Sequence, residues 1–373
     1  MAKKRHISIE TPSLFDDFDT PADAPAEVKP AKKEKPESIF TATPLPVHPD
    51  IAKAAQQELD IQIKKKPAEE KPDDDDDFVK VTPIDRLLFI SFGSGSSGCC
   101  AYLGTEDEGI IIDAGIDAKK VVDSLKSNGI APSAVKGIIL THDHRDHVAF
   151  AYTLAKRLNK ERRNAETVLI HSSLHTLKGM LLRHNISIRV KDLHKPFFLE
   201  TAFKIGDFSI TPFAVSHDGL NDTAFGFHIA LGGYTFALAT DTGCPTDGMR
   251  RYLSDADYIM IESNYDSEML RTGRYPEYLK ARIRSEKGHS DNDDCAHFLA
   301  EIYSPRLKHI FLCHLSEENN TPELARNASL KALTDKGVNV GEGQNTLDDR
   351  QADVQLSVLP RRDISPLYTF RKD

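Results

Sequence analysis

The sequence lacks any run of eighteen apolar residues, which excludes an ordinary membrane-spanning helix. The first residues, MAKKRHISIE, continue into acidic, proline-broken sequence and not into the apolar stretch of a secretion signal. The sequence also has fewer positive than negative residues, with 48 Lys and Arg against 57 Asp and Glu. The net charge of −9 excludes a protein that coats nucleic acid through bulk positive charge. We expect a soluble protein with no membrane partner.

Cysteine is scarce, odd in number and never spaced as CxxC. The five cysteines include the neighbours Cys99 and Cys100, which can hardly bridge each other. Reduced thiols are the simplest account of this pattern, and reduced thiols are typical of the cytoplasm. We therefore expect a cytoplasmic location.

Glycine is absent before Gly93, whereas residues 1–80 hold ten of the twenty prolines and end near the acidic run 73–77. This stretch has little of the apolar periodicity needed to offset the entropy cost of ordering. We expect residues 1–80 to be a disordered, Pro-rich, charged tail, and residues 81–373 to form one catalytic domain. The apolar residues within 13–18 could dock a protein partner, although chance also accounts for them.

From residue 86 onward, short apolar runs punctuated by glycine predict strands, and segments with helical periodicity lie between several of them. The expected strands are 87–92, 109–112, 137–140, 167–170, 208–215, 224–230, 235–239, 258–261 and 309–313. The expected helices are 118–127, 147–159, 172–184, 276–285 and 293–302. This order predicts an α/β fold, a layered sandwich of sheets covered by helices.

The most informative stretch follows the apolar run 137–140, where His-x-His-x-Asp-His begins. Imidazoles two residues apart at a strand end can point the same way, toward one metal ion. The Asp and His that follow can turn toward a second ion. Four side chains of metal-ligating type in six residues are hard to explain as an ordinary surface loop: His142, His144, Asp146 and His147.

The same arrangement recurs after later apolar runs, where the chain places His217, Asp241 and His314. A lone histidine after a strand is usually structural, but recurrence at several strand ends favours one shared metal centre. Asp113 also follows an apolar run, and we expect it to brace the His142 loop and not to bind metal.

This ordered set resembles the metallo-β-lactamase superfamily over roughly residues 86–320. The resemblance implies an αββα sandwich of two mixed sheets flanked by helices, and a hydroxide nucleophile between two divalent ions. It implies one ion on His142, His144 and His217, another on Asp146, His147 and His314, and Asp241 bridging both. Ligands of these types suit Zn²⁺, Mn²⁺ or Fe²⁺.

Further residues bear on the substrate. Glu262 and His289 could form a carboxylate–imidazole pair that assists a leaving group, as in RNase Z-like phosphodiesterases, although His289 could be an unrelated surface residue. We expect Asp146 to be catalytic as well. The basic segment 271–287 could bind a nucleic-acid backbone, or it could be an ordinary amphipathic helix. The residues expected to contact substrate are Ser94, Ser96, Ser97, Asn264, Arg274, Tyr275, Arg282 and Asn292.

Motifs outside the metal core resemble the YycJ/WalJ branch of the superfamily. They are Ser-Gly-Ser-Ser-Gly at 94–98, Val-Ser-His-Asp at 215–218, Glu-Ser-Asn-Tyr-Asp at 262–266, Gly-Arg-Tyr-Pro at 273–276 and the run 314–323. The resemblance implies a DNA 5′-exonuclease in DNA repair or processing, acting on DNA ends or single strands. One departure is Asp291, which adds a negative charge where the branch has serine, so a phosphate contact is not carried over to that position.

Two alternatives stay open. A thioester or other small-molecule hydrolase of the glyoxalase II type needs the same metals, although only 59 residues follow His314 and no glutathione-binding domain is evident. A recruitment factor whose tail matters more than its chemistry would not need the complete ligand set. An RNase J-type nuclease is excluded, because the interval from Asp241 to His314 is 314−241 = 73 residues, too short for the domain inserted there.

Overall fold

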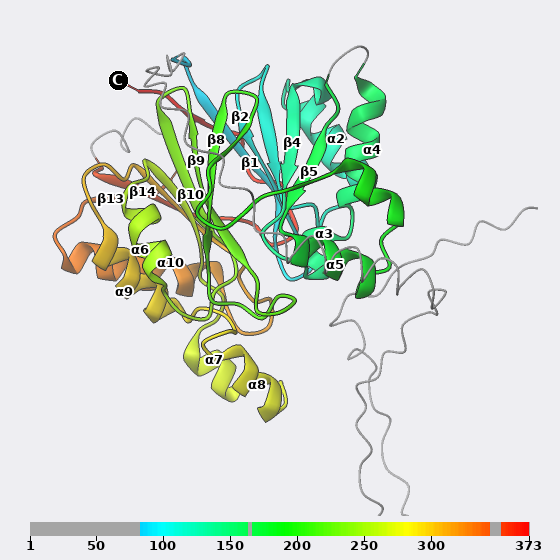
Figure 1. Cartoon of the computed structure of the whole chain (residues 1–373). Helices are drawn as coiled ribbons and strands as arrows, with labels where there is room; N and C mark the ends of the chain where they lie inside the picture. Colours follow the sequence, from blue (N-terminus) through cyan, green and yellow to red (C-terminus); the bar gives the residue numbers. More distant parts are fainter. Residues whose placement is uncertain (1–82, 163–165, 344–351, 373) are drawn as a thin grey trace, which may run out of the picture. The chain divides into compact units, whose positions relative to one another are not determined.

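The computed structural model describes residues 83–162, 166–343 and 352–372, and in them two mixed β-sheets pack face to face between outer helices (Figure 1). This arrangement confirms the expected α/β sandwich. The expected tail, residues 1–80 with its docking peptide, lies outside the described residues. None of the helices in the described residues is long and apolar enough to span a membrane.

The first sheet has seven strands in the spatial order β15-β1-β2-β3-β4-β5-β6. The strands are β1 (Leu87–Gly95), β2 (Gly98–Gly104), β3 (Gly109–Ile112), β4 (Val135–Ile139), β5 (Leu169–Ser172), β6 (His194–Pro196) and β15 (Tyr368–Phe370). Pairing is antiparallel from β15 to β3 and parallel from β3 to β6. A meander thus continues into a parallel half whose strands end at one edge.

The second sheet repeats this plan with eight strands in the order β13-β14-β12-β11-β10-β9-β8-β7. The strands are β7 (Phe203–Ile205), β8 (Phe208–Ala214), β9 (Phe225–Leu231), β10 (Tyr234–Ala239), β11 (Tyr258–Glu262), β12 (His309–Cys313), β13 (Val340–Gly341) and β14 (Val354–Val358). Pairing is antiparallel from β7 to β10 and parallel from β10 onward. The residues after His314 therefore complete the two sheets.

Helices cover the outer face of each sheet, and one pair of helices projects from the body (Figure 1). The helices are α2 (Ala118–Ser127), α3 (Arg145–Val148), α4 (Ala151–Glu161), α5 (Leu174–Leu182), α6 (Asp247–Ser254), α7 (Ser267–Thr272), α8 (Glu277–Ile283), α9 (Asn292–Ile302) and α10 (Pro322–Asp335). Two 3₁₀ turns span Pro132–Ala134 and Ile188–Leu193. Helices α2, α4 and α5 pack on the first sheet, and α6, α9 and α10 pack on the second.

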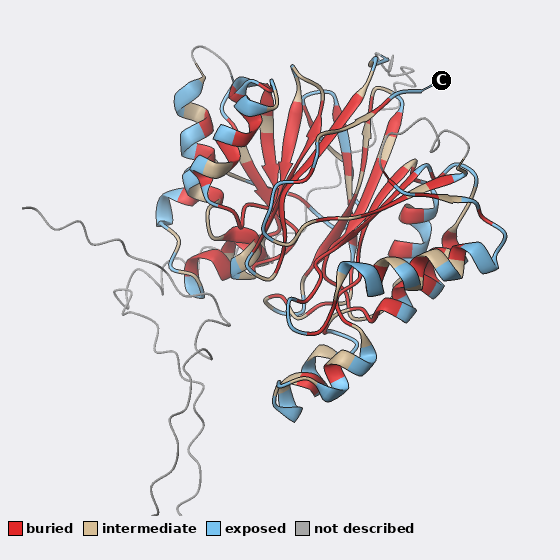
Figure 2. Ribbon diagram, turned by 180° about the vertical axis from the view of Figure 1, so that it is seen from behind, coloured by how far each residue is buried: buried red, intermediate tan, exposed pale blue. Residues whose placement is uncertain are grey.

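Alternation along β1 shows how the sequence builds the layers. Leu87 and Phe89 face the core between the sheets, whereas Leu88 and Ile90 face the core under α2 and α4. Successive side chains of a strand point to opposite faces, so a strand buried on both faces is apolar at every position. Figure 2 shows the resulting buried strands, with exposed residues concentrated on the outer surfaces of the helices.

The predicted elements correspond closely to the observed ones, with informative differences. The helix expected at 147–159 is divided into α3 and α4, because Phe150 has non-helical backbone angles and its N–H binds the carbonyl oxygen of Ala114. The elements that the sequence did not predict are β2, β6, β7, β13, β14, β15, α6, α7 and α10. The strand β2 reads Gly-Cys-Cys-Ala-Tyr-Leu-Gly, which has few of the β-branched residues that mark strands.

Candidate metal centre

The expected ligands gather at one edge of the sandwich, where strands of both sheets end. Asp113 follows β3 and the His142 loop follows β4 in the first sheet. In the second sheet His217 follows β8, Asp241 follows β10 and His314 follows β12. Parallel strands share an edge for their carboxyl ends, so ligands distant in sequence converge there. The edge lies beside α3 in Figure 1.

The first ligand cluster consists of His142, His144 and His217, whose ring nitrogens lie within 4.8 Å of one another. Nδ1 of His144 lies 3.2 Å from Nε2 of His217. Nitrogen ligands about 2.0–2.1 Å from a zinc ion lie roughly 3.3–3.5 Å apart in a tetrahedron. The separation of these two nitrogens is therefore close to that of two ligands on one divalent ion.

The second ligand cluster contains Asp146, His147 and His314, with ligand atoms also within 4.8 Å of one another. Oδ2 of Asp146 lies 3.7 Å from Nε2 of His147 and 3.5 Å from Nε2 of His314. Cys99, at the start of β2, places its sulfur in the same cluster. The sequence analysis missed Cys99, because nothing in the sequence pattern near residue 99 resembles a ligand motif.

Asp241 lies between the two clusters and is almost wholly buried. Its Oδ1 is 3.7 Å from Nε2 of His217 in the first cluster, and its Oδ2 is 3.3 Å from Nε2 of His147 in the second. Oδ1 also lies 3.2 Å from Nδ1 of His314, so the carboxylate lies among residues of both clusters. Burial opposes ionisation of Asp241, but the surrounding imidazoles, first His314 and then His147, hold the pKa of its carboxyl well below the usual value.

Buried polar atoms without a partner show that these residues fit metal ions. Nε2 of His142, His147 and His314 and Oδ2 of Asp241 are buried and make no hydrogen bond. Buried polar atoms are nearly always hydrogen-bonded, so four such atoms aimed into one space need another partner. Imidazole nitrogen and carboxylate oxygen are ligands of zinc and of other divalent transition metals.

In His142, His147 and His217 a hydrogen bond holds the ring nitrogen opposite to Nε2. Nδ1 of His147 lies 2.8 Å from Oδ2 of Asp113, and Nδ1 of His217 lies 2.8 Å from the carbonyl oxygen of Gly288. Nδ1 of His142 is bonded to the Thr141 hydroxyl at 3.0 Å. Holding Nδ1 in this way fixes the tautomer and turns Nε2 toward a metal.

Asp113 lies where a bracing residue is needed. Its carboxylate accepts hydrogen bonds from the backbone N–H of Thr141 at 2.9 Å and from the Thr141 hydroxyl at 3.0 Å, in addition to His147. Asp113 has a φ of 57°, and His314 has a φ of 53°. Left-handed angles in non-glycine residues cost about 1–3 kcal/mol and persist where the surroundings enforce them.

The surroundings of His314 enforce its conformation through two residues expected to contact substrate. The Ser94 hydroxyl accepts a hydrogen bond from the backbone N–H of His314 at 3.1 Å, and Nδ2 of Asn264 donates to its carbonyl oxygen at 2.7 Å. Both side chains are buried. The structure therefore differs from the substrate-binding expectation, and gives Ser94 and Asn264 the role of positioning His314.

Asn292, also expected to contact substrate, is buried, and the structure explains the negative charge at Asp291. The Asn292 side chain is buried and hydrogen-bonded to the Ser263 hydroxyl and to the Asn320 side chain, so in this structure it holds neighbouring loops together. Asp291 caps α9 by accepting a hydrogen bond from the N–H of Asp293 at 2.7 Å. Its carboxylate is therefore a helix cap, which is a favoured use of aspartate at this position.

The expected pair of Glu262 and His289 is present beside the clusters. Oε1 of Glu262 lies 2.7 Å from Nδ1 of His289 and 2.9 Å from Nδ1 of His314, so one buried carboxylate orients both rings. Burial lowers the pKa of His289, but the Glu262 carboxylate outweighs burial, and the pKa is raised. The side chain of His289 remains 23% exposed. It is therefore accessible to a substrate.

The carboxylate of Asp218, for which the sequence predicted no role, lies next to the first cluster. Oδ1 of Asp218 lies 3.4 Å from Nε2 of His144, and Oδ2 accepts a hydrogen bond from Nε of Arg282 at 3.0 Å. Arg282 is thus paired with a residue at the metal centre. The adjacency of Asp218 to His217 in the sequence was the available signal.

The basic segment is less open than the sequence suggested. Lys280 is buried, with its ammonium on Glu277 and on the carbonyl oxygen of Arg271. Arg271 pairs with Glu268, and Lys287 pairs with Asp222. Glu268 and Asp222 lie outside the segment 271–287, so the charges within the segment alone overestimate its positive field. Arg274 is exposed and Tyr275 is half-buried in the loop between α7 and α8.

The turn joining β1 to β2 holds the other two residues expected at the substrate. Ser96 is half-buried and Ser97 is exposed in this turn, whose flanking residues Gly95 and Gly98 are paired. The turn lies between Ser94, which holds His314, and Cys99 of the second cluster. Both serines are therefore placed at the rim of the metal centre.

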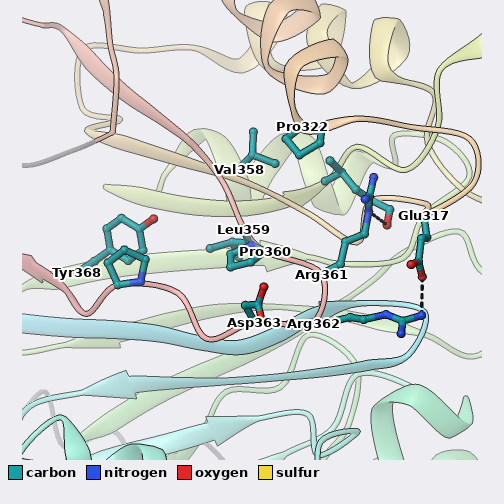
Figure 3. A pocket seen from close by; sticks show the side chains of 11 residues that line it. Glu317, Pro322, Val358, Leu359, Pro360, Arg361, Arg362, Asp363 and Tyr368 are labelled. Atoms are coloured by element: carbon teal, nitrogen blue, oxygen red, sulfur yellow. Dashed lines mark hydrogen bonds and ion pairs between the residues drawn. The ribbon is translucent and has the colours of Figure 1, made fainter.

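A pocket of about 490 Å³ lies beside the centre, and Figure 3 shows its lining. None of its lining residues belongs to the ligand clusters. Arg361 donates to the carbonyl oxygens of Leu315 at 3.1 Å and Asn320 at 2.7 Å, and Arg362 pairs with Glu317 at 2.6 Å. Arg361 therefore fastens the segment after β14 to the loop that follows His314.

Comparison with known proteins gives a consistent result. Residues 109–314 match the family model described as the beta-lactamase superfamily domain. The chain is 35% identical over 256 residues to "Exodeoxyribonuclease YycJ" of Bacillus anthracis, covering 69% of this chain and 92% of the relative. It is 33% identical over 249 residues to "Exodeoxyribonuclease WalJ" of Streptococcus pneumoniae serotype 2, covering 66% and 88%.

A solved structure agrees with these matches at the level of the fold. The metallo-beta-lactamase fold protein YhfI from Bacillus subtilis superposes with a TM-score of 0.53 at 14% identity, covering 75% of this chain and 99% of that protein. At this identity the likeness shows the fold alone.

Proposed function

We propose a nuclease function from the premise that the chain belongs to the metallo-β-lactamase superfamily and, within it, to the YycJ/WalJ group. As a member, it is a metal-dependent hydrolase. The proposal is that it holds two divalent ions and acts as a DNA 5′-exonuclease in DNA repair or processing. DNA ends or single strands are its substrates, and its five free thiols suit a cytoplasmic location.

One observation carries the proposal: Asp241 has a ligand atom within 4.8 Å of those of His142 in the first cluster and His147 in the second, and an oriented imidazole lies next to them. His142, His144 and His217 would hold one ion, and Asp146, His147 and His314 the other. Two close divalent ions would lower the pKa of a shared water and neutralise charge developing on a phosphodiester.

The protein's own groups have distinct roles around those ions. Asp146 is the carboxylate of the second cluster that reaches solvent, with 19% of its side chain exposed, and it orients the attacking water. The Nδ1–H group of His289 donates a hydrogen bond to the Glu262 carboxylate, so Nε2 is the nitrogen that can face a substrate. The raised pKa keeps the ring protonated to higher pH, and it can therefore protonate the leaving oxygen.

Substrate would approach along the rim and the projecting helices. Ser96 and Ser97 can present hydroxyls and backbone N–H groups to a phosphate at the rim. Arg274 and Tyr275, between α7 and α8, can bind a phosphate and stack on an unpaired base. Arg282, held by Asp218, links that surface to the first cluster.

DNA is favoured over a thioester by the relatives. Both relatives named above are called exodeoxyribonucleases. The described residues that follow His314 form α10, β13, β14 and β15, and these strands join the two sheets. The described residues 315–343 and 352–372 therefore contribute to the sandwich itself.

Degradation of end-labelled DNA tests the proposal. Full-length protein with Mn²⁺ or Zn²⁺ is incubated with single- and double-stranded DNA labelled at the 5′ or the 3′ end, and Asp241→Asn is the matched control. We expect metal-dependent release of nucleotides from the 5′ end by the wild type and none by the variant. Intact DNA under every metal, together with hydrolysis of a thioester panel, would refute the nuclease proposal.

A further inference from the structure

Cys99 contributes an unexpected sulfur to the second ligand cluster. Its Sγ lies within 4.8 Å of ligand atoms of Asp146, His147 and His314, and the side chain is buried. A cysteine alone would not indicate a site. Here two further atoms point to a ligand, because Nε2 of His147 and Nε2 of His314 are buried without a partner and lie in the same cluster.

The backbone holds Cys99 against the loop that carries Asp146. The carbonyl oxygen of Cys99 accepts a hydrogen bond from the N–H of Gly115 at 2.9 Å. A Cβ atom on Gly115 would lie 1.5 Å from the carbonyl oxygen of Asp146 and 2.9 Å from the N of Cys99, so only glycine allows this approach. The position of the sulfur is thus built into the fold.

The neighbouring Cys100 shows that this placement is specific. Successive residues of a strand face opposite sides, and the Cys100 side chain packs in the apolar core under α2. The Cys99 side chain instead points to the edge where the ligands gather. Within 4.8 Å its sulfur meets two imidazoles and one carboxylate, a set of donors that binds zinc in proteins.

We propose that the Cys99 thiolate is a further protein ligand in the second cluster, beside Asp146, His147, His314 and the shared Asp241. The inference rests on the proposed metal centre and adds a sulfur donor to it. Binding of the ion displaces the thiol proton, which passes to solvent. A thiolate favours Zn²⁺ over the harder Mn²⁺, so Cys99 would set the metal preference of the second site.

Cobalt substitution tests the proposal independently of activity. Full-length protein is freed of metal and titrated with Co²⁺, and thiolate-to-cobalt charge-transfer absorption is recorded in the near ultraviolet. We expect the band in the wild type and in Cys100→Ser, and its loss in Cys99→Ser. The affinity for the second ion should fall at least about ten-fold in Cys99→Ser. Circular dichroism establishes that each variant is folded.

The outcomes separate this inference from the nuclease proposal. Two bound Co²⁺ ions without the band in the wild type would overturn the role of Cys99 and leave the two-metal centre standing. Persistence of the band in Cys99→Ser would also overturn it. Failure to bind Co²⁺ at all would overturn both the metal centre and the inference. If Cys99→Ser does not fold, the presence or absence of the charge-transfer band in the wild-type protein decides whether a thiolate binds the ion.

Discussion

Four of the five imidazoles in the ligand clusters, all but that of His144, have their other nitrogen held by an oxygen of a neighbouring residue. The site depends on these residues as well as on the ligands. Asp113 holds His147, Glu262 holds His314, and the carbonyl oxygen of Gly288 holds His217. Residues of this kind typically change metal affinity or activity by about 10–100-fold.

Replacing Asp113 with Asn tests this bracing role. The amide keeps the size of the carboxylate, but its nitrogen cannot accept the hydrogen bonds that Thr141 and His147 donate. We expect bound metal or DNA hydrolysis to fall by about 10–100-fold, measured by elemental analysis and DNA degradation. The exposed Asp123→Asn is the control, and equal behaviour of the two variants would contradict the assigned role.

His289→Ala separates catalysis from metal binding. His289 touches Glu262, but it is not needed to complete either ligand cluster, so bound metal should stay close to the wild-type value. Loss of a general acid lowers turnover by about 10²–10⁴-fold. The comparison is Glu262→Gln, which should lower bound metal as well, because Glu262 also holds His314. Full turnover in His289→Ala would remove His289 from the mechanism.

At the residue scale, the sequence was sufficient to predict which residues gather at the strand ends when their spacing forms a recognisable pattern. The string from His142 to His147 and the strand-end residues Asp241 and His314 could be recognised because ligands follow apolar runs. Cys99 could not be recognised, since its role depends on β2 lying beside a loop nearly fifty residues away. The positioning roles of Ser94 and Asn264 likewise depend on contacts between strands distant in sequence.

At the scale of elements, β5 carries a buried histidine that makes stability depend on pH. Burial lowers the pKa of His171 from 6.5 to about 4, and its ring stacks on Phe203. Below pH 6.5 the unfolded chain binds a proton at this position that the folded chain does not accept until about pH 4. Stability present above pH 6.5 is therefore lost as the pH falls to about 4.

Replacing His171 with Phe should remove that part of the acid sensitivity. The loss of unfolding free energy between about pH 6.5 and pH 4 should shrink by roughly 2–3 kcal/mol, measured by denaturant unfolding. The exposed His297→Gln is the control and should keep the wild-type pH dependence. An unchanged pH dependence in His171→Phe would show that burial of His171 does not contribute.

The helices α7 and α8 are the element on which substrate binding can be tested. Arg274 is exposed between them, whereas Arg271, on the same pair of helices, is bonded to Glu268. Arg274→Ala should raise KM for DNA with little change in kcat. It should also reduce the slope of the logarithm of the binding constant against the logarithm of salt concentration by about one. Arg271→Ala removes the same charge and should have the smaller effect. Equal effects would argue against a specific phosphate contact by Arg274.

The elements themselves were predictable where the apolar pattern was strong. The helix expected at 118–127 is observed with those bounds, because Asp117 caps it and its apolar face is periodic. The strands β14 and β15 were missed because they are short and take their strand form from pairing with β12 and β1. Pairing of this kind is a tertiary effect that local propensity does not contain.

At the scale of the molecule, every side chain assigned to the site lies between Ser94 and His314. Removal of residues 1–80 should therefore leave kcat and KM for short oligonucleotides unchanged, which steady-state kinetics of the truncated and full-length proteins will check. Long DNA is the companion substrate, since any contribution of the tail to binding would appear there first. Collapse of activity on short oligonucleotides would show that the tail is not separable from catalysis.

The central claim is that strand-end residues of both sheets form one two-metal nuclease centre. Metal-free full-length protein titrated with Mn²⁺ or Zn²⁺, with bound ions and DNA hydrolysis measured on the same samples, tests this most directly. We predict two ions per chain, activity that appears as they bind, and neither full occupancy nor activity in Asp241→Asn. Rapid DNA hydrolysis by the ion-free chain, or a fully loaded chain that leaves DNA intact, would contradict the account.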